Sequence, residues 1–196
     1  MKKNTFSTVN LCYIGVMTAI AVVLSFILKI PMSFLAPWLK LDLSFVPMML
    51  TGFALGPVAG LCVLLVTNII HLFASNSGMV GQLADVILGF CFMMPAVLIY
   101  QKVHTRKGAL IGMAVGTLCL IVGGVLSNLY ILFPLYFGSD FAAGLAKIGF
   151  ESVLNCILVA VVPFNIIKGV VISVVTFLLY KRLSKLLHKL AGQKKA

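Results

Sequence analysis

Charged residues are scarce in this sequence, and acidic residues are the scarcest. Only 10% of the 196 residues are charged and four are Asp or Glu, whereas 62% are hydrophobic. An ordinary soluble domain has about 25% charged and about 45–50% apolar residues. The composition therefore excludes an ordinary soluble domain and indicates an integral membrane protein. We expect residues 1–196 to form a single membrane domain.

Several chemical motifs are also missing. The sequence has no G-x-x-x-x-G-K-[ST] loop, so the chain cannot hydrolyse ATP with that machinery. Its five cysteines lie singly, without a C-x-x-C pair or a Cys/His cluster at zinc spacing. The four acidic residues, Asp42, Asp85, Asp140 and Glu151, form no metal-binding or nucleophile–base motif. We therefore expect no metal, no cofactor and no enzymatic activity.

Long apolar runs dominate what the sequence does contain. Five of them reach or approach the roughly 18 to 20 residues that cross a hydrocarbon core of about 30 Å as a helix, and a shorter run lies between two of these. We predict an all-α, polytopic membrane protein with six transmembrane helices, an even number that places both termini on one side. The predicted spans are residues 9–28, 44–55, 57–73, 80–100, 109–133 and 163–180.

Basic residues indicate how these spans are oriented. With six spans, eleven of the fifteen Lys and Arg residues fall on the side of the termini, and only Lys29, Lys40 and Lys147 lie in loops on the other side. Cytoplasmic loops are the ones enriched in Lys and Arg, so both termini are predicted to be cytoplasmic. The net charge of +11 is then mainly a topology signal, with anionic lipid headgroups as contacts. We expect no nucleic-acid partner, because no interleaved aromatic residues accompany the basic tail.

Strongly polar side chains of the spans are predicted to lie at one depth. At about 1.5 Å per residue, Lys168 is about 18 Å from the cytoplasmic interface at Tyr180, and Asn165 projects from the same helical face. The fifth span carries Asn128 to about 28 Å from its inner edge. The other polar residues that fall near the outer surface are Asn68, His71, Gln82 and Asp85. This asymmetry predicts a polar pocket that opens outward above an apolar floor.

Lys168 is the polar residue that is hardest to explain structurally. It stands in "VVPFNIIKGVVI" without a nearby carboxylate in the sequence, which we interpret as an unpaired lysine. Burying an ammonium group costs at least about 2.5 kcal/mol on insertion scales. Asparagine both donates and accepts hydrogen bonds, whereas lysine only donates. Lys168 lies at the same predicted depth as the amides of Asn128 and Asn165. Together they predict a ligand rich in carbonyl or anionic oxygen.

Structural roles compete with ligand binding for the other polar residues. Asn68 and Asn128 suit interhelical hydrogen bonds, which contribute about 0.6 kcal/mol on average. His71 suits a packing role, and Asp85 suits an N-cap or a first-turn carboxylate at the start of the fourth span. The sequence leaves these alternatives open.

Two outer connections are predicted to be structured. Residues 29–42 contain Pro31, Pro37 and Trp38, and tryptophan is enriched at headgroup depth. The second half of the connection 138–162 is apolar enough for a short helix on or in the outer leaflet. Pro163 then suits the first turn of the last span, where its missing N–H is harmless.

Small residues recur at four-residue spacing in three spans. Segments 56–60 and 112–116 each begin and end with glycine, and this G-x-x-x-G pattern predicts close packing inside the bundle. Gly15 and Ala19 form a similar small face on the first span. We interpret that face as an interface for another membrane subunit.

Five segments of the sequence together resemble the riboflavin-binding S components of energy-coupling factor (ECF) vitamin transporters: "IGVMTAIAVVL", "FLAPWLKLDLSFVPMMLTGFALGPVAG", "TNIIHLF", "SNLYILFPLYF" and "VPFNIIKGVVISVVTFLLYKRL". The resemblance runs over almost the whole chain. It implies a six-helix subunit that captures riboflavin, FMN or an analogue from outside. Such a subunit delivers the vitamin through a transmembrane coupling protein powered by two cytoplasmic ATPases.

The resemblance also implies roles for individual residues. The amide of "SNLY" and the asparagine and lysine of "NIIK" contact the flavin in this family, which corresponds to Asn128, Asn165 and Lys168. The first outer loop closes over the substrate, which implicates Leu41 and Asp42. Asn68 and Gln82 join the expected substrate-binding set because of their depth in the membrane.

The first span matches the family face that touches the coupling protein. An A-x-x-x-A pattern there corresponds to Gly15 and Ala19, with glycine in place of the first alanine. Phe45 stands where many relatives have a second acidic residue, so the loop contacts are expected to differ in detail.

Two other functions remain as alternatives to riboflavin capture. The same fold in the same family binds other vitamins, such as thiamine, biotin or folate. A membrane-embedded enzyme acting on lipids or isoprenoids is the remote alternative, because such enzymes usually need the clustered carboxylates or activated nucleophile that this sequence lacks.

Overall fold

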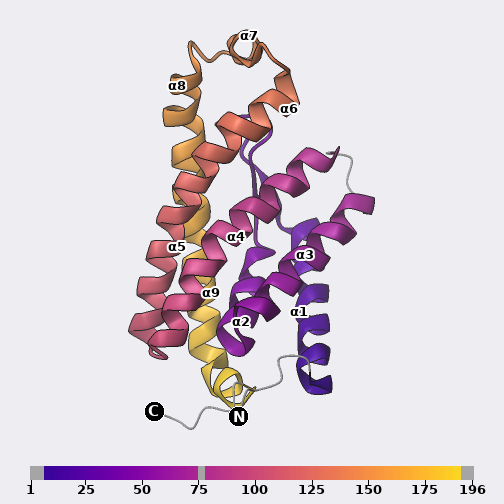
Figure 1. The fold of residues 1–196 in the computed structure, drawn as a ribbon, viewed down its shortest axis with the longest axis vertical. Helices are drawn as coiled ribbons and strands as arrows, with labels where there is room; N and C mark the ends of the chain where they lie inside the picture. The colour runs from indigo at the N-terminus through magenta and orange to yellow at the C-terminus, as the bar shows by residue number, and fades with distance from the viewer. Residues whose placement is uncertain (1–6, 75–77, 191–196) are drawn as a thin grey trace.

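The computed structural model describes residues 7–74 and 78–190 and consists mainly of helices (Figure 1). The elements in chain order are α1 (Thr8–Ile27), β1 (Lys29–Pro31), β2 (Lys40–Asp42), α2 (Phe45–Leu55), α3 (Pro57–Ala74), α4 (Gly78–Lys102), α5 (Arg106–Ser127), the π-helical turn η1 (Asn128–Leu132), α6 (Phe133–Phe137), α7 (Phe141–Lys147), α8 (Val153–Cys156), the π-helical turn η2 (Ile157–Val161) and α9 (Val162–Leu190).

Helix length and composition agree with a membrane protein. Among the described residues, four helical runs are long and apolar enough to cross a membrane: Thr8–Ile27, Met79–Lys102, Arg106–Phe137 and Val153–Arg182. Two shorter apolar helices, Phe45–Leu55 and Pro57–Phe73, correspond to the second and third predicted spans. The first four predicted spans match α1 to α4 within two residues at each end.

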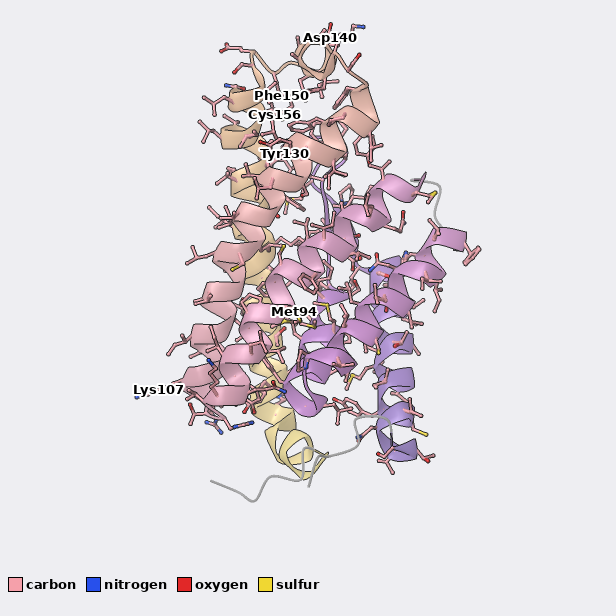
Figure 2. All side chains as sticks on the ribbon, viewed as in Figure 1. Met94, Lys107, Tyr130, Asp140, Phe150 and Cys156 are labelled. Carbon is pink, nitrogen blue, oxygen red and sulfur yellow. The ribbon has the colours of Figure 1, made fainter. Side chains whose placement is uncertain are left out.

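The two ends of the bundle differ in charge and in structure. The start of α1, the α2–α3 turn, the α4–α5 connection and the end of α9 lie at one end, whereas α7 lies at the other (Figure 1). Lys107 in the α4–α5 region and Asp140 before α7 mark these two ends (Figure 2). Exposed Lys102, Arg106 and Lys107 therefore gather at the end opposite α7.

Side-chain caps and one glycine start and stop the helices at the loops. Ser7, Thr105 and Ser152 each accept a hydrogen bond from a backbone N–H three residues later, as N-cap residues do. Gly56 has φ = 101°, a left-handed conformation that glycine adopts without strain, and it turns the chain between α2 and α3. Pro57 follows directly as the first residue of α3, where its missing N–H is harmless.

A short hairpin departs from the predicted all-α structure. Strands β1 and β2 pair antiparallel inside the first outer loop, with Ile30 opposite Leu41. The loop between them folds over the end of α5, because Ala36 and Leu39 belong to a buried apolar cluster with Phe133. This packing gives the loop a defined shape, which the prolines alone did not reveal.

The last helix corrects a second expectation. Pro163 does not begin it: the helical run is continuous from Val153 to Leu190, through α8, η2 and α9. Proline lacks an N–H and its ring displaces the carbonyl four residues earlier. The widened turn η2 ends two residues before Pro163, and η1 likewise ends two residues before Pro134. A π-turn relaxes the helix locally, so the chain passes through each proline instead of ending there.

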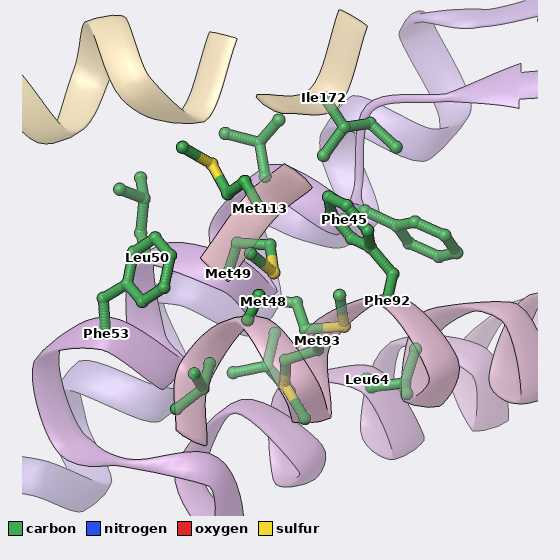
Figure 3. Close-up of a cluster of buried hydrophobic side chains, with 14 of the residues drawn as sticks. Phe45, Met48, Met49, Leu50, Phe53, Leu64, Phe92, Met93, Met113 and Ile172 are labelled. Carbon is green, nitrogen blue, oxygen red and sulfur yellow. The ribbon is translucent and has the colours of Figure 1, made fainter. Parts of the chain in front are cut away.

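A methionine-rich core holds α2, α3, α4, α5 and α9 together (Figure 3). Phe45, Met49, Phe92, Met93 and Ile172 are among its fully buried members. Methionine fills irregular gaps between helices because its side chain is flexible and polarisable. A second, smaller apolar cluster lies under the loop of the hairpin.

Glycines allow α4 and α5 to approach closely. A Cβ added at Gly112 would lie 2.5 Å from the Ala96 carbonyl oxygen, and one at Gly116 would lie 2.5 Å from that of Phe92. Both oxygens belong to backbone and cannot move aside. The predicted internal packing of segment 112–116 is therefore confirmed, and Gly60, whose Cβ would lie 3.1 Å from Gly52 Cα, packs in the same manner.

Replacing Gly112 by alanine is expected to loosen this contact. The added methyl group must push α4 and α5 apart, and such overpacking typically lowers the free energy of unfolding by about 1–3 kcal/mol. Thermal unfolding of the purified protein in detergent measures the change. Gly15→Ala is the matched control, because no described atom lies within 4 Å of a Cβ added there. Equal stability of the two variants would contradict the close approach.

Candidate functional site

A cavity of about 410 Å³ lies at the end of the bundle that carries the hairpin and α7. Four parts of the chain line it: the loop of the hairpin, α4, the continuous run from α5 to α6, and α9, with Ile148 added from the connection after α7. The polar lining residues are Trp38, Lys40, Asp85, Asn128, Tyr136, Asn165 and Lys168. Its size and mixed lining are those of a site for a small organic molecule.

Asn128 and Asn165 line the cavity, and each bonds to its own helix through its amide nitrogen. Each amide nitrogen donates to the backbone carbonyl four residues earlier, Asn128 to Gly124 and Asn165 to Val161, both at 2.8 Å. Both amide oxygens are buried and accept no hydrogen bond from any described residue. Since buried polar atoms are normally paired, these two acceptors suit N–H or O–H donors of a bound molecule.

Lys168 is paired, which corrects the interpretation of an unpaired lysine. Its Nζ lies 3.1 Å from Oδ1 of Asp85, and its side chain is 1% exposed. The Phe45 ring centroid is 4.2 Å from the same Nζ, close enough for a cation–π contact. Asp85 lies in the interior of α4, seven residues after Gly78, so it is neither an N-cap nor a first-turn residue. The carboxylate missing from the sequence around Lys168 comes from a helix 83 residues away.

Three predicted site residues from two helical runs therefore line one cavity. Asn128 from η1 and Asn165 and Lys168 from α9 all line it. The two π-turns contribute to this arrangement, since η1 begins at Asn128 and η2 ends at Val161, whose carbonyl accepts the Asn165 amide. π-turns inside longer helices occur frequently at functional sites.

The other predicted site residues do not line the cavity. Leu41 and Asp42 are buried in the hairpin, where Asp42 Oδ1 accepts the Ser44 N–H at 2.7 Å, and their neighbours Leu39 and Lys40 reach the cavity. Asn68 donates to the Leu64 carbonyl of its own helix at 2.8 Å. Gln82 is buried on α4 and is likewise absent from the lining.

An aromatic wall is the part of the site that the sequence did not reveal. Trp38 packs against three rings of α6, with centroid distances of 6.0 Å to Phe133, 6.4 Å to Tyr136 and 5.7 Å to Phe137. The Trp38 Nε1 is buried and donates to no described residue. Trp38 was interpreted as a headgroup residue, yet it lines the cavity. The aromatic run in "YILFPLYF" was the available signal, because a loop facing it needs an apolar partner.

His71 has the packing role that its sequence position suggested. It is buried between α1 and α3, hydrogen-bonds to Ser25 and stacks on Phe26 with ring centroids 4.6 Å apart. Gly15 and Ala19 lie on the exposed face of α1, away from these contacts. The structure thus leaves the small face of α1 open for another molecule.

Comparisons with known proteins agree with this site and fold. Residues 9–180 match the family "ECF transporter, substrate-specific component". The chain is 40% identical over 191 residues to the riboflavin transporter RibU of Staphylococcus aureus (strain TCH60), covering 96% of this chain and 97% of that protein. It is 31% identical over 178 residues to the riboflavin transporter FmnP of Bacillus subtilis (strain 168), covering 89% and 91% of the two chains.

A solved structure has the same fold. It is described as "Structure and mechanism of the S component of a bacterial ECF transporter", is 37% identical, covers 90% of this chain and 96% of its own, and superposes with a TM-score of 0.75. These likenesses confirm the resemblance inferred from the sequence segments. The chain belongs to the substrate-specific (S) components of ECF transporters, and it is a multi-pass membrane protein and not an enzyme.

Proposed function

We propose that this S component binds riboflavin from the extracellular side and delivers it to a transporter. The observation that carries the proposal is the cavity lining. It combines Asn128 and Asn165, whose buried amide oxygens accept no hydrogen bond from a described residue, with Lys168 and apolar side chains. The curated relatives that share 40% and 31% identity with the chain are named riboflavin transporters.

Flavin chemistry complements this wall. The isoalloxazine ring is flat and largely apolar, and its pyrimidine edge carries an N–H between two carbonyl groups. Asn128 and Asn165 offer acceptors for N–H and O–H groups, and Lys168 offers a donor for a carbonyl. Trp38 and Leu88 supply apolar surface for the ring. In this proposal Leu41 and Asp42 support the site, since the hairpin that they hold carries Trp38 and Lys40 to the cavity.

The proposed topology has six spans, with both termini in the cytoplasm of a bacterial cell. Charge distribution supports it, because Lys102, Arg106 and Lys107 connect α4 to α5 at the end of the bundle opposite the cavity. The two short helices α2 and α3 supply the second and third spans. Residues 1–196 then form one membrane domain, and the cavity opens to the outside.

Transport by this subunit requires partners that supply energy. The sequence has no nucleotide-binding loop of the P-loop type. In the proposed assembly, a transmembrane coupling protein and two cytoplasmic ATPases provide the motor. The exposed face of α1 with Gly15 and Ala19 fits the coupling protein, because small residues let two helices approach closely in a membrane.

A panel of vitamins tests the proposed substrate directly. We expect the purified protein to bind riboflavin by isothermal titration and to retain a yellow flavin through purification. Thiamine, biotin and folate are expected to give no binding heat and no displacement. Preferential binding of one of those three would overturn the assignment while leaving the family intact.

Lys168→Met tests the role of the ammonium group. The methionine side chain keeps most of the volume of the lysine stem but removes the donor, leaving a buried carbonyl of the substrate unpaired. Affinity for riboflavin is expected to fall by about 1–3 kcal/mol, which is roughly 5- to 150-fold in Kd. Isothermal titration measures it. An unchanged Kd would remove Lys168 from the site.

Gly124→Ala tests the position of Asn165 without changing any residue that lines the cavity. A Cβ at Gly124 would lie 2.4 Å from Nδ2 and 2.8 Å from Cγ of Asn165, so the amide must leave its place. We expect riboflavin affinity to fall by about tenfold, the equivalent of one lost hydrogen bond. Gly123→Ala is the control, because its Cβ would meet the Cys91 side chain instead. Equal affinities of the two variants would show that Asn165 does not contact the flavin.

A further inference from the structure

Asp85 occupies an unusual place at the cavity. Among the described residues that line it, Asp85 carries the only carboxylate, and the two cations are Lys40 and Lys168. Asp85 is 20% exposed, whereas its partner Lys168 is 1% exposed. The carboxylate therefore faces the cavity while the ammonium group lies in the wall.

Lys168 depends on this carboxylate because Asp85 is its only ion-pair partner among the described residues. The rings of Phe45 and Phe164 lie 4.2 Å and 5.9 Å from its Nζ. Aromatic rings attract a cation but do not replace a counter-ion in a membrane interior. A buried ammonium group left without its carboxylate is strongly destabilising, whereas removing both charges together is often nearly neutral.

The ion pair also connects two helices across the cavity. Asp85 belongs to α4, which packs mainly on α5 and α3, and Lys168 belongs to α9, which packs mainly on α5 and α2. The bond of 3.1 Å therefore determines where the ammonium group lies between these helices. An ammonium group has three donors, so hydrogen bonding to Asp85 leaves donors for a substrate oxygen.

We propose that Asp85 is a positioning residue of the substrate site: it compensates the charge of Lys168 and holds its ammonium group where a substrate carbonyl accepts from it. The part that concerns substrate rests on the proposed function of riboflavin binding. The part that concerns charge compensation holds for the empty protein.

A double-mutant cycle without ligand tests charge compensation. The proteins are the wild type, Asp85→Asn, Lys168→Met and the double variant, all measured by thermal unfolding in detergent. Asparagine keeps the shape of Asp85 and an acceptor oxygen, so Asp85→Asn removes only the charge. We expect Asp85→Asn to lower the midpoint temperature of unfolding by roughly 5 °C or more. The double variant is expected to regain most of that loss. Additive losses would overturn the proposal.

Riboflavin titration of the same four proteins tests positioning. Asp85→Asn is expected to raise Kd about tenfold when Lys168 is present and less than about twofold when Lys168 is methionine, because Asp85 acts through the ammonium group. The absorption spectrum of bound flavin gives a readout that general destabilisation does not alter. Flavin bound to the Asp85→Asn variant should have a spectrum shifted toward that of flavin bound to the Lys168→Met variant. An equal loss of affinity in both backgrounds would show that Asp85 acts independently of Lys168.

Asp140→Asn is the matched control for the change of carboxylate to amide. Asp140 is exposed, caps α7 and does not line the cavity. The Asp140→Asn variant is expected to have the unfolding midpoint, the riboflavin Kd and the flavin spectrum of the wild type. If the wild type binds no riboflavin, the proposed function fails, and the unfolding cycle still decides whether Asp85 compensates Lys168. An Asp85→Asn variant identical to the wild type in midpoint and in Kd would overturn the inference.

Discussion

Polar groups inside a lipid-embedded bundle find no water, so each of them needs a partner within the protein. Several side chains of the spans meet this need by donating to the carbonyl four residues earlier in their own helix, at 2.8–2.9 Å: Thr18, Thr51, Asn68, Thr117, Asn128 and Asn165. For an asparagine this local bond has a second consequence. It uses the nitrogen, and the amide oxygens of Asn128 and Asn165 are then buried without a donor among the described residues.

The wall also depends on two places where the α-helix is widened. Pro134 and Pro163 interrupt the regular hydrogen bonding of the helices that carry the site, and each is preceded by a π-turn. These turns keep the helical run continuous while altering the direction of the side chains near them. Asn128 is the first residue of η1, and the Asn165 amide donates to the carbonyl of Val161, the last residue of η2. The same local distortion that accommodates a proline therefore contributes to the geometry of the site.

The remaining structure separates an end with a cavity from a filled end. Away from the cavity, the Tyr100 and Tyr180 hydroxyls pair at 2.9 Å beside Phe53, and a methionine-rich apolar core fills the bundle. A bundle packed in this way holds a cavity at one end and has a filled centre. This arrangement is consistent with a subunit that captures substrate and relies on partners for its movement.

The sequence by itself determined the membrane class, the first four helices within two residues at each end, the basic end of the bundle, and the shared depth of Asn128, Asn165 and Lys168. These are local properties: hydrophobic length, charge position and the rise of about 1.5 Å per residue can be read along one segment. Only the tertiary structure decided that Asp85 pairs with Lys168, that the first outer loop is a hairpin carrying Trp38 to the cavity, and that the last helix runs through Pro163. The Asp85–Lys168 pair and the placement of Trp38 are contacts between segments far apart in the chain, so they depend on how the helices pack against one another. The helix through Pro163 depends on a π-turn, which no residue type specifies.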